Sequence, residues 1–361
     1  MVLVAGARPN FMKIAPLIHC IQRHNESLAA RKVDLFLVHT GQHYDPQMSD
    51  VFFRELAIPN PNATLEVGSG SHAAQTANVM TRFEPVCEQQ RPDWVVVVGD
   101  VNSTMACTLV AVKMGIKVAH IEAGLRSFDR TMPEEINRLV TDSIADLLLT
   151  PSEDGNENLR REGVDPSKIK LVGNIMIDAL LENLDKADAS RVLQNNGLSE
   201  KEFVYVTLHR PANVDHRENF SSIIKELTKV ARQLPVVFPM HPRTRKMAQQ
   251  FGIDLTAGSG FKVLEPVGYH DSLRLTKTAR IVITDSGGLQ EESTYFRTPC
   301  ITVRPNTERP ITVTIGSNKL TTPADLPRHL DELLKSNQVK GEIPPLWDGK
   351  TSERVLQCLL E

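Results

Sequence analysis

Residues 94–121 read WVVVVGDVNSTMACTLVAVKMGIKVAHI and contain one complete strand–helix–strand unit. Trp94–Val98 and Lys117–Ile121 are short apolar runs of the length expected for buried strands. Between them, Thr104–Met114 has the longer pattern of a helix. Strands joined through a helix pair in parallel, because parallel pairing needs a crossover connection rather than a tight turn. The stretch therefore predicts a parallel sheet covered by helices.

The same alternation extends along the chain in both directions and then starts again. The first half has further strand-like runs at Val2–Ala5, Leu35–His39 and Leu147–Thr150, and a helical pattern at Phe11–His24. The second half has strands at Val204–Leu208, Val236–Met240, Ile281–Thr284 and Cys300–Val303, and helices at Phe220–Gln233 and Leu289–Phe296. At 361 residues the chain is also longer than one ordinary domain.

We therefore predict an α/β protein of two Rossmann-like domains whose parallel sheets face a cleft. The seam is expected near Lys168–Asn174, which gives an N-terminal domain of residues 1–170 and a C-terminal domain of residues 171–349. The last segment, residues 350–361, has an amphipathic pattern over Ser352–Leu360 and is expected to form a helix that can pack back on the first domain.

Composition argues against several classes of protein. A net charge of −3 leaves no basic excess to neutralise phosphates, so no nucleic-acid partner is expected. No apolar run approaches the roughly 18 residues of a membrane span, and Met1–Ala5 reads as a core strand rather than a secretory signal. The five cysteines are dispersed without zinc or redox spacing, which is typical of buried thiols in a reducing compartment. We expect a cytoplasmic protein with no membrane partner.

Charged residues gather directly after the strand Lys117–Ile121. The two motifs at the ends of the stretch His120–Arg138, HIEAGLRS and PEEINR, hold three carboxylates (Glu122, Glu134 and Glu135), two arginines and a histidine. In an α/β protein the carboxyl end of a strand is where a ligand binds. Carboxylates there can transfer protons, and arginines beside them can hold an anion. The alternative is a solvated loop with surface ion pairs, and the residues by themselves leave both open.

Two other strand ends of the first half carry candidate residues. Gly6–Lys13 supplies two cations, Arg8 and Lys13, near a helix N-terminus, where an anion is favoured. Val98–Ser103 places the carboxylate of Asp100 after the next strand. Each has a structural alternative, which is a turn with surface cations in the first case and a helix cap in the second.

The second half contains the sharpest phosphate candidate, Asp285–Glu292, which reads DSGGLQEE. Gly287 and Gly288 let a ligand approach the backbone, and a helix begins there with free N–H groups. A tight turn whose acidic residues favour the helix dipole is the alternative. Three more strand ends bring cations, namely His209 with Arg210, His241 with Arg243, and Arg304 with Arg309.

Two patterns are set aside. Gly68–Ala73, GSGSHA, fits the loose dinucleotide-binding pattern but follows only a short mixed segment, so we interpret it as a mobile loop that caps a helix and expect no NAD. His39 and His43 have the spacing of metal ligands, but Gly41 and the strand end prevent a shared helix face. We therefore expect no metal site there.

From the residues alone, the chain is interpreted as a two-domain enzyme. The second half holds a ligand that bears a diphosphate, and the first half supplies carboxylates. Carboxylates facing a leaving diphosphate suit glycosyl chemistry, which includes elimination, transfer and hydrolysis. The sequence pattern does not choose among the three.

The succession of motifs resembles the non-hydrolysing UDP-N-acetylglucosamine 2-epimerases. From Gly6 to about Leu320 the motifs are, in order, RPxxxK, TGQH, GDxxS, HxEAGLRS, PEExNR, LHR, DSGGxQEE and TERP. The resemblance implies the two-Rossmann-domain GT-B architecture. It also implies an isomerase that interconverts UDP-N-acetylglucosamine (UDP-GlcNAc) and UDP-N-acetylmannosamine (UDP-ManNAc) with no cofactor, neither NAD nor a metal.

In that family a base removes the C2 proton while UDP leaves C1 by anti elimination, and UDP then adds back to 2-acetamidoglucal. Carried over by motif, the acid/base carboxylates would be Asp100, Glu122 and Glu134, and His209 would contact the diphosphate or donate a proton. The residues that would bind UDP or the sugar are Arg8, Lys13, Ser286, Gly287, Gly288, Glu292 (on the ribose) and Arg309. Arg126, Asn137 and Arg138 are expected to orient these carboxylates rather than to react. Glu135 is left without an assigned role, as a helix-start or structural acid.

The chain departs from the family at a few positions. Asn10 stands where Glu is common, Pro211 where Arg or Glu is common, and Ile311 where Glu often stands. The segment Gln42–Met48 is longer than usual, in a region that helps form a second, allosteric UDP-GlcNAc site in bacterial members. The resemblance therefore does not extend to that regulation.

Other functions remain as alternatives. His241–Arg245 and Pro266–Tyr269 also resemble epimerases that act on UDP-2,3-diacetamido-2,3-dideoxyglucuronic acid. A GT-B glycosyltransferase and a catalytically inactive nucleotide-sugar binder form a second class. Hydrolysing epimerases are disfavoured because their first-loop motif differs from Arg8-Pro-Asn. The resemblance further implies a homodimer and a role in making cell-surface polysaccharide or glycoconjugate precursors.

Overall fold

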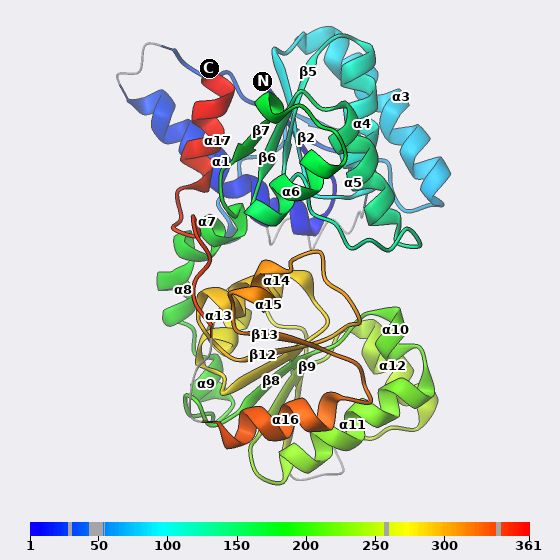
Figure 1. The fold of residues 1–361 in the computed structure, drawn as a ribbon, viewed down its shortest axis with the longest axis vertical. Coiled ribbons are helices and arrows are strands. Elements are labelled where there is room, and N and C mark those ends of the chain that lie inside the picture. The colour runs from blue at the N-terminus through cyan, green and yellow to red at the C-terminus, as the bar shows by residue number, and fades with distance from the viewer. Residues whose placement is uncertain (28–30, 43–52, 54, 256–259, 337–340) are drawn as a thin grey trace. The chain divides into compact units, whose positions relative to one another are not determined.

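The computed structural model describes residues 1–27, 31–42, 53, 55–255, 260–336 and 341–361. These residues divide into two compact units, each built around its own sheet (Figure 1). The first unit is Met1–Ala179 together with Pro345–Glu361, and the second unit is Leu180–Pro344.

The first unit has a seven-stranded sheet in the order β3-β2-β1-β4-β5-β6-β7, in which every pair of neighbours is parallel. Its strands are β1 (Val2–Ala5), β2 (Phe36–His39), β3 (Ala63–Thr64), β4 (Trp94–Val98), β5 (Lys117–Ile121), β6 (Leu147–Thr150) and β7 (Ile169–Leu171). Helices cover both faces of this sheet (Figure 1), namely α1 (Arg8–Glu26), α3 (His72–Gln90), α4 (Asn102–Lys113), α5 (Pro133–Ile144), α6 (Glu153–Arg161) and α17 (Thr351–Leu360). The helix α7 (Ile175–Glu182) continues from the first unit into the second.

The second unit has a six-stranded parallel sheet in the order β10-β9-β8-β11-β12-β13. Its strands are β8 (Val204–Thr207), β9 (Val236–Pro239), β10 (Phe261–Leu264), β11 (Ile281–Thr284), β12 (Cys300–Val303) and β13 (Asn318–Thr321). Its helices are α8 (Leu184–Asp188), α9 (Val192–Asn195), α10 (Pro211–Val214), α11 (Arg217–Ala231), α12 (Pro242–Phe251), α13 (Tyr269–Thr278), α14 (Gly287–Tyr295), α15 (Ile311–Thr314) and α16 (Leu326–Lys335).

The prediction of two parallel-sheet α/β domains is confirmed. In each sheet the strand order reverses next to the first strand of the unit, between β1 and β4 and between β8 and β11. Ligands of open parallel sheets bind at this switch point, outside the carboxyl ends of the strands. The residues that follow β1, β4, β8 and β11 are therefore the ones that the fold brings into position for chemistry.

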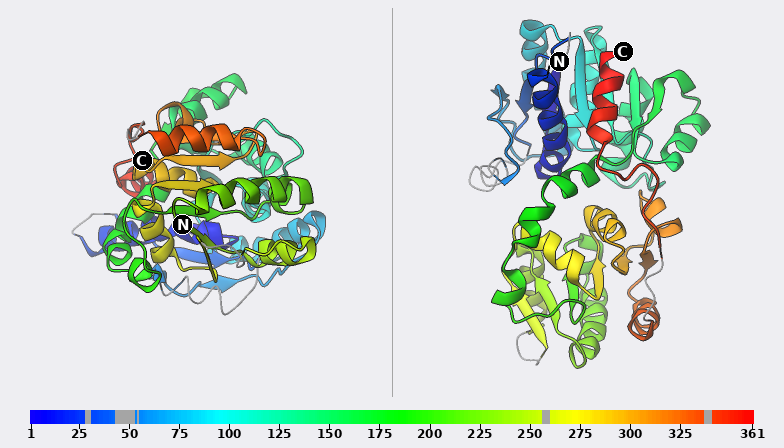
Figure 2. Two further views of the ribbon diagram at one scale, coloured as in Figure 1. Left: turned by 90° about the horizontal axis from the view of Figure 1, so that it is seen from below. Right: turned by 90° about the vertical axis from the view of Figure 1, so that its left-hand side faces the viewer.

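The chain enters the second unit later than residue 170. The boundary expected there lies within β7, and the chain leaves the first unit after Ala179. The chain then returns to the first unit, where α17 packs on α1 (red beside blue in Figure 2). Asp178 holds the start of α17, because its carboxylate accepts hydrogen bonds from the backbone N–H of Thr351 (3.1 Å) and Ser352 (2.7 Å). A carboxylate at this position caps the helix and complements its dipole.

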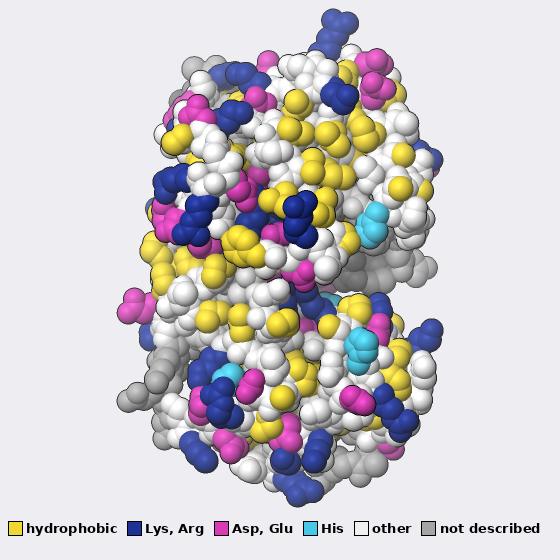
Figure 3. All heavy atoms as spheres, turned by 45° about the vertical axis from the view of Figure 1, so that its right-hand side comes forward, with side chains coloured by type: hydrophobic (Ala, Val, Ile, Leu, Met, Phe, Trp, Pro, Cys, Tyr) yellow, Lys and Arg dark blue, Asp and Glu magenta, His cyan; other side chains and the backbone are white. Residues whose placement is uncertain are grey.

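Surface and thiol features agree with a globular protein. All five cysteines are free thiols, and four of them are buried. Basic and acidic side chains are interspersed on the face shown in Figure 3 rather than separated into one basic area. Within the described parts of the chain, the helices lack the length and hydropathy that a membrane span needs.

Candidate active site

The loop after β1 is tied to β4 by the side chain of Asn10. Its Oδ1 accepts hydrogen bonds from the backbone N–H of Gly6 and Ala7 (3.0 Å each), and its Nδ2 donates to the Val98 carbonyl (3.1 Å). Asn10, which differs from the common family residue, is therefore used to shape this loop. Arg8 opens α1, but its side chain lies outside the described part of the structure.

Lys13 and Glu122 form a buried ion pair at the carboxyl edge of the first sheet. Lys13 is 7% exposed and Glu122 is 4% exposed, and the Lys13 ammonium contacts Oε2 of Glu122. The pair lies over Gly99, since a Cβ at Gly99 would be 3.0 Å from Lys13 Nζ and 3.7 Å from Glu122 Oε2. Among the described residues, the other oxygen of Glu122, Oε1, has no hydrogen-bond partner. One carboxylate oxygen is thus held by a cation, while the other is left for a further proton or ligand.

The backbone at Glu122 is strained. Its φ of +70° lies in the left-handed region, which non-glycine residues adopt at a cost of about 1–2 kcal/mol. The turn is held by hydrogen bonds from the N–H groups of Glu122 and Ala123 to the Leu149 carbonyl (3.1 and 3.2 Å). Strain of this kind concentrates at functional sites, where the surrounding structure enforces it.

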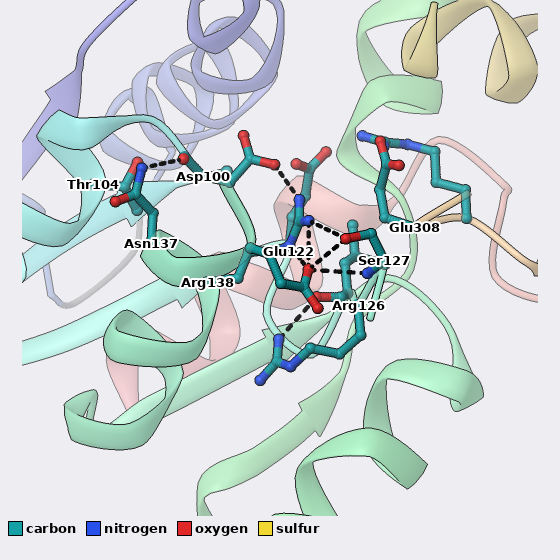
Figure 4. Close-up of polar contacts among 12 residues, drawn as sticks. Asp100, Thr104, Glu122, Arg126, Ser127, Asn137, Arg138 and Glu308 are labelled. Atoms are coloured by element: carbon teal, nitrogen blue, oxygen red, sulfur yellow. Dashed lines mark hydrogen bonds and ion pairs between the residues drawn. The ribbon is translucent and has the colours of Figure 1, made fainter. Parts of the chain in front are cut away.

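Arg138 joins Asp100 to the loop after β5. Its guanidinium pairs with Oδ2 of Asp100 on one side and with Oε2 of Glu135 on the other (2.6 Å), as Figure 4 shows for the side that faces Asp100. Asn137 donates to the Asp100 carbonyl (2.8 Å). Arg138 is buried while the Asp100 side chain is 29% exposed. The buried guanidinium of Arg138 therefore fixes the orientation of a carboxylate that is partly open to solvent.

Glu135 is committed to the fold. Its carboxylate accepts hydrogen bonds from the backbone N–H of Ser127 and Phe128 (2.9 Å each) in addition to pairing with Arg138. Burial alone would raise the pKa of Glu135, but these donors hold it below its ordinary value. Glu134, the preceding residue, is exposed in the first turn of α5. The first unit thus gathers Asp100 and Glu122 at the ends of β4 and β5, and leaves Glu134 at its surface.

Arg126 is also engaged by protein carboxylates. Its Nε and Nη2 form a bidentate pair with Glu162 (2.8 and 2.6 Å), and its Nη1 donates to Asp142 (2.7 Å). An arginine held on two sides in this way fixes structure rather than binding an incoming anion. Arg126 therefore supports the loop that carries Glu122.

In the second unit, Asp285 organises the loop after β8. This buried carboxylate accepts hydrogen bonds from the backbone N–H of His209 (3.1 Å) and Arg210 (2.9 Å) and from the side chain of Asn213 (3.0 Å). It also lies 3.0 Å from Nδ1 of His209. Burial alone would raise the pKa of Asp285, but these donors hold it below its ordinary value. Asp285 was absent from the predicted site residues, although its position directly after a buried strand was a usable signal.

The Asp285 contact engages Nδ1 of His209. Because an ionised carboxylate only accepts, Nδ1 of His209 carries a proton. The His209 side chain is 43% exposed, so this histidine is open to solvent.

The SGG segment opens α14. Ser286 is the N-cap residue, and its N–H donates to the hydroxyl of Thr284 (2.9 Å). The helix begins at Gly287, and the N–H groups of its first turn have no partner within the helix, which favours an anion there. A Cβ at Gly287 would lie 3.0 Å from Nη1 of Arg309, so a glycine is needed to keep this cation close to the helix start.

Arg309 belongs to a buried group of charges. Its Nε is 2.8 Å from Glu291, and its Nη1 pairs with Glu308, which also pairs with Arg304 (2.8 Å). Burial alone would raise the pKa of Glu308, but the two arginines hold it well below its ordinary value. The two cations and two carboxylates balance one another beside the start of α14.

Glu292 is a buried carboxyl of a different kind. Burial and the neighbouring Glu291 raise its pKa to about 8. In the described structure its Oε2 has no hydrogen-bond partner, and neither has the hydroxyl of Tyr269, whose pKa burial and Glu292 also raise. Buried polar atoms without partners are costly and are commonly satisfied by a ligand or water.

This environment makes the stability of the protein depend on pH through Glu292. An acid whose pKa rises from its ordinary 4.5 to about 8 on folding binds more protons in the folded state, so its contribution is complete below about pH 4.5 and is lost as pH rises towards 8. We expect wild-type stability to fall across this range by roughly 2–5 kcal/mol more than that of Glu292→Gln. Urea unfolding of both proteins at several pH values measures the difference.

A matched control is Glu265→Gln. Glu265 is an exposed partner of Arg245, with its side chain 81% accessible, so this variant should follow the wild-type pH dependence. Parallel pH profiles for wild type and Glu292→Gln would contradict the assignment of a raised pKa.

The glycine-rich segment Gly68–Ala73 and the histidine His39 both have structural roles in the fold. Ser71, within Gly68–Ala73, is the N-cap of α3 and accepts from the N–H of Ala74 (3.2 Å), so the predicted helix cap is confirmed. His39 is buried beside Phe11, and His43 lies outside the described residues. Within the described residues, no three His, Cys, Asp or Glu side chains gather in a way that would hold a metal ion.

Comparisons with known proteins agree on one family. The model of the family described as UDP-N-acetylglucosamine 2-epimerase matches residues 26–360. The UDP-N-acetylglucosamine 2-epimerase of Methanocaldococcus jannaschii is 40% identical over 369 residues, which covers 99% of this chain and 98% of that protein. The UDP-2,3-diacetamido-2,3-dideoxy-D-glucuronate 2-epimerase of Pseudomonas aeruginosa is 39% identical over 321 residues, covering 88% and 86% of the two chains.

Solved structures give the same result. The M. jannaschii UDP-GlcNAc 2-epimerase in complex with UDP-GlcNAc and UDP is similar with a TM-score of 0.89 and 39% identity, covering 99% of both chains. The Neisseria meningitidis enzyme bound to UDP-GlcNAc is similar with a TM-score of 0.89 and 29% identity, again over 99% of both chains.

Proposed function

Because the chain belongs to the UDP-N-acetylglucosamine 2-epimerase family, we propose that it interconverts UDP-GlcNAc and UDP-ManNAc without hydrolysing the nucleotide sugar. The observation that carries this proposal is the buried Lys13–Glu122 pair, which leaves Oε1 of Glu122 without a partner among the described residues. A carboxylate that has one oxygen without a partner at a strand end is suited to take a proton from carbon.

The proposed reaction has two stages. In the first, a carboxylate removes the C2 proton while the C1–O bond breaks and its electrons leave with UDP, which gives 2-acetamidoglucal. In the second, UDP adds back to C1 and an acid delivers a proton to the opposite face of C2. Two groups on opposite faces are required, and Glu122, Asp100 and Glu134 are the candidates. Lys13 holds Oε2 of Glu122, so Oε1 is the oxygen of this carboxylate that is left for the C2 proton.

The second unit is the proposed UDP site. The start of α14, with Ser286, Gly287 and Gly288, offers N–H groups to the diphosphate. Arg309 is proposed to lie near the diphosphate beside Gly287, with Glu291 and Glu308 holding its guanidinium in place. His209, oriented by Asp285, would donate from Nε2 to the leaving oxygen or to the diphosphate when its ring carries a proton on both nitrogens. Charge that develops on UDP as it leaves would be stabilised by these donors, which act most strongly in the transition state.

Glu292 and two first-unit cations complete the proposed binding set. The buried carboxyl of Glu292 has an oxygen without a partner in the described structure, which a ribose hydroxyl would satisfy. Arg8 and Lys13 are proposed to contact the UDP or the sugar.

Incubation with UDP-GlcNAc alone in deuterated water tests the proposal. We expect UDP-ManNAc with deuterium at C2, and deuterium in the recovered UDP-GlcNAc. Release of free N-acetylmannosamine would identify a hydrolysing enzyme. Turnover only after an acceptor is added would identify a glycosyltransferase, and neither exchange nor turnover would identify an inactive binder.

UDP-2,3-diacetamido-2,3-dideoxyglucuronic acid is the second candidate substrate. The 39% identity to the P. aeruginosa enzyme favours it. A uronate adds a carboxylate that needs a cation, but Arg243 already pairs with Asp215, and Arg245 pairs with Glu265 at 2.8 Å. A uronate would have to displace those partners, which favours the neutral sugar. Competition between the two UDP-sugars at equal concentration measures the preference.

Three wider expectations accompany the proposed reaction. We expect a homodimer, which light scattering on the purified protein would detect. A cytoplasmic location and a role in supplying precursors for cell-surface polysaccharide also follow from the proposed substrate.

A further inference from the structure

Two histidine–aspartate pairs occur among the described residues, and they differ in the exposure of the histidine. His209 has one ring nitrogen on Asp285 and a side chain that is 43% exposed. His120, in β5, is fully buried, and both of its ring nitrogens are engaged. Its Nδ1 lies 2.6 Å from Oδ1 of Asp142, and its Nε2 lies 2.8 Å from the Gly99 carbonyl oxygen.

Both partners of His120 are acceptors. A carbonyl oxygen cannot donate, so Nε2 carries a proton. Asp142 has no proton to give, because its other oxygen accepts from Arg126 Nη1 (2.7 Å) and from the Gly124 N–H (3.0 Å). Nδ1 therefore carries a proton as well.

The charges around this ring agree with a cation. Arg126 pairs with both Asp142 and Glu162, so the group holds two carboxylates and one guanidinium. A protonated His120 makes the group neutral overall. The Glu162 side chain is 34% exposed, so its charge is partly solvated, and the protonation of His120 rests on its two hydrogen-bond acceptors.

The peptide group that His120 contacts joins Gly99 to Asp100 and lies next to the candidate site residues. Gly99 donates its N–H to the Ile121 carbonyl (3.1 Å) and offers its own carbonyl to His120, so it is clamped to β5 on both sides. Gly99 lies under the Lys13–Glu122 pair, and Asp100 is the next residue. Glu122 follows His120 by two residues on the same strand end.

We propose that His120 is a buried imidazolium that acts as a positioning residue, holding the Gly99–Asp100 peptide beneath the Lys13–Glu122 pair. The inference rests on the proposed function for its catalytic consequence, but its protonation state stands without that function. His120 itself does not touch the reacting atoms. It sets where the Asp100 and Glu122 carboxylates stand relative to each other.

Protonation is tested on the unmodified protein. Long-range ¹H–¹⁵N correlation spectra of histidine side chains distinguish the cation from either neutral tautomer. We expect the cationic pattern for His120 at neutral pH, and its conversion to a neutral pattern in Asp142→Asn. A neutral tautomer in the wild-type protein would overturn the proposal, and this result does not depend on any activity.

Positioning is tested by kinetics. We expect His120→Gln to lower kcat for epimerisation by about 10-fold to 100-fold, with little change in KM or in UDP binding, because small displacements of reacting groups are costly to the chemical step. His329→Gln, at a histidine on α16 that bonds Thr321, is the matched control and should keep wild-type kcat. A His120→Gln enzyme with wild-type kcat would refute the positioning role.

The two tests separate the possible failures. If wild-type protein shows no epimerisation with UDP-GlcNAc, the proposed function fails while the spectrum still decides the state of His120. If His120→Gln does not fold, the Asp142→Asn spectrum and the wild-type spectrum remain decisive.

Discussion

Glu122→Gln should lose C2 proton exchange almost completely while it still binds UDP. Glutamine has nearly the same shape as glutamate, but it cannot accept a proton from carbon at Oε1. General acid–base groups contribute roughly 10²–10⁴-fold, so we expect the rate of deuterium entry at C2 to fall by about 10³-fold. The rate is measured by mass spectrometry of UDP-sugar incubated in deuterated water.

The same substitution leaves Lys13 without its ionised partner. Because that ammonium is buried, we expect a modest loss of stability, roughly 1–3 kcal/mol, which thermal unfolding would detect. Glu157→Gln makes the same chemical change in an exposed ion pair with Arg161 and should keep both activity and stability. Wild-type exchange in Glu122→Gln would remove Glu122 from the mechanism. Asp100→Asn is expected to keep the fold and lose most exchange as well.

Gly124→Ala should destabilise the protein severely. Gly124 belongs to the turn that also contains Glu122. Gly124 has a φ of +80°, and a Cβ there would lie 2.4 Å from the carbonyl oxygen of Gly155 and 2.8 Å from its carbon. These are backbone atoms, so the contact cannot be relieved by turning a side chain. We expect a loss of about 3–5 kcal/mol in the free energy of unfolding, measured by urea denaturation.

Gly163→Ala separates the two causes of that loss. Gly163 has nearly the same φ, +82°, but a Cβ added there would have no atom of the described residues within 4 Å. It should therefore show only the cost of a left-handed backbone, about 1 kcal/mol. Equal losses in the two variants would mean that the contact with Gly155 is absent in solution.

The strands that the sequence pattern missed share a position in the fold. The internal strands were located to within a residue or two, because burial on both faces makes them continuous apolar runs. The missed strands β3, β7, β10 and β13 are the four edge strands of the two sheets. Three of them contain exposed or half-buried residues throughout, and β13 is half-buried at its centre. An edge strand has too little apolar sequence to be recognised without its neighbour.

The candidate site shows a similar division. Asp100 and Glu122 could be singled out because each follows a buried strand. The difference between Glu134 and Glu135 could not be predicted, because it depends on the rotation of α5. Successive residues of a helix point about 100° apart, which turns Glu135 inward to Arg138 and leaves Glu134 exposed. His120 contacts Asp142, and His209 contacts Asp285. The residues of each pair are far apart in the chain, so these contacts cannot be predicted from the local sequence.

The cap that Asp178 places on α17 has a consequence for synthesis on the ribosome. Its donors, Thr351 and Ser352, are translated only after all of residues 180–344, which form the second unit. Until then, the surface of α1 that receives α17 stays uncovered, and the Asp178 carboxylate lacks these donors. The second unit is translated in full before the first has its last helix. The first unit therefore depends, for its complete packing, on a segment that is translated after the whole of the second unit.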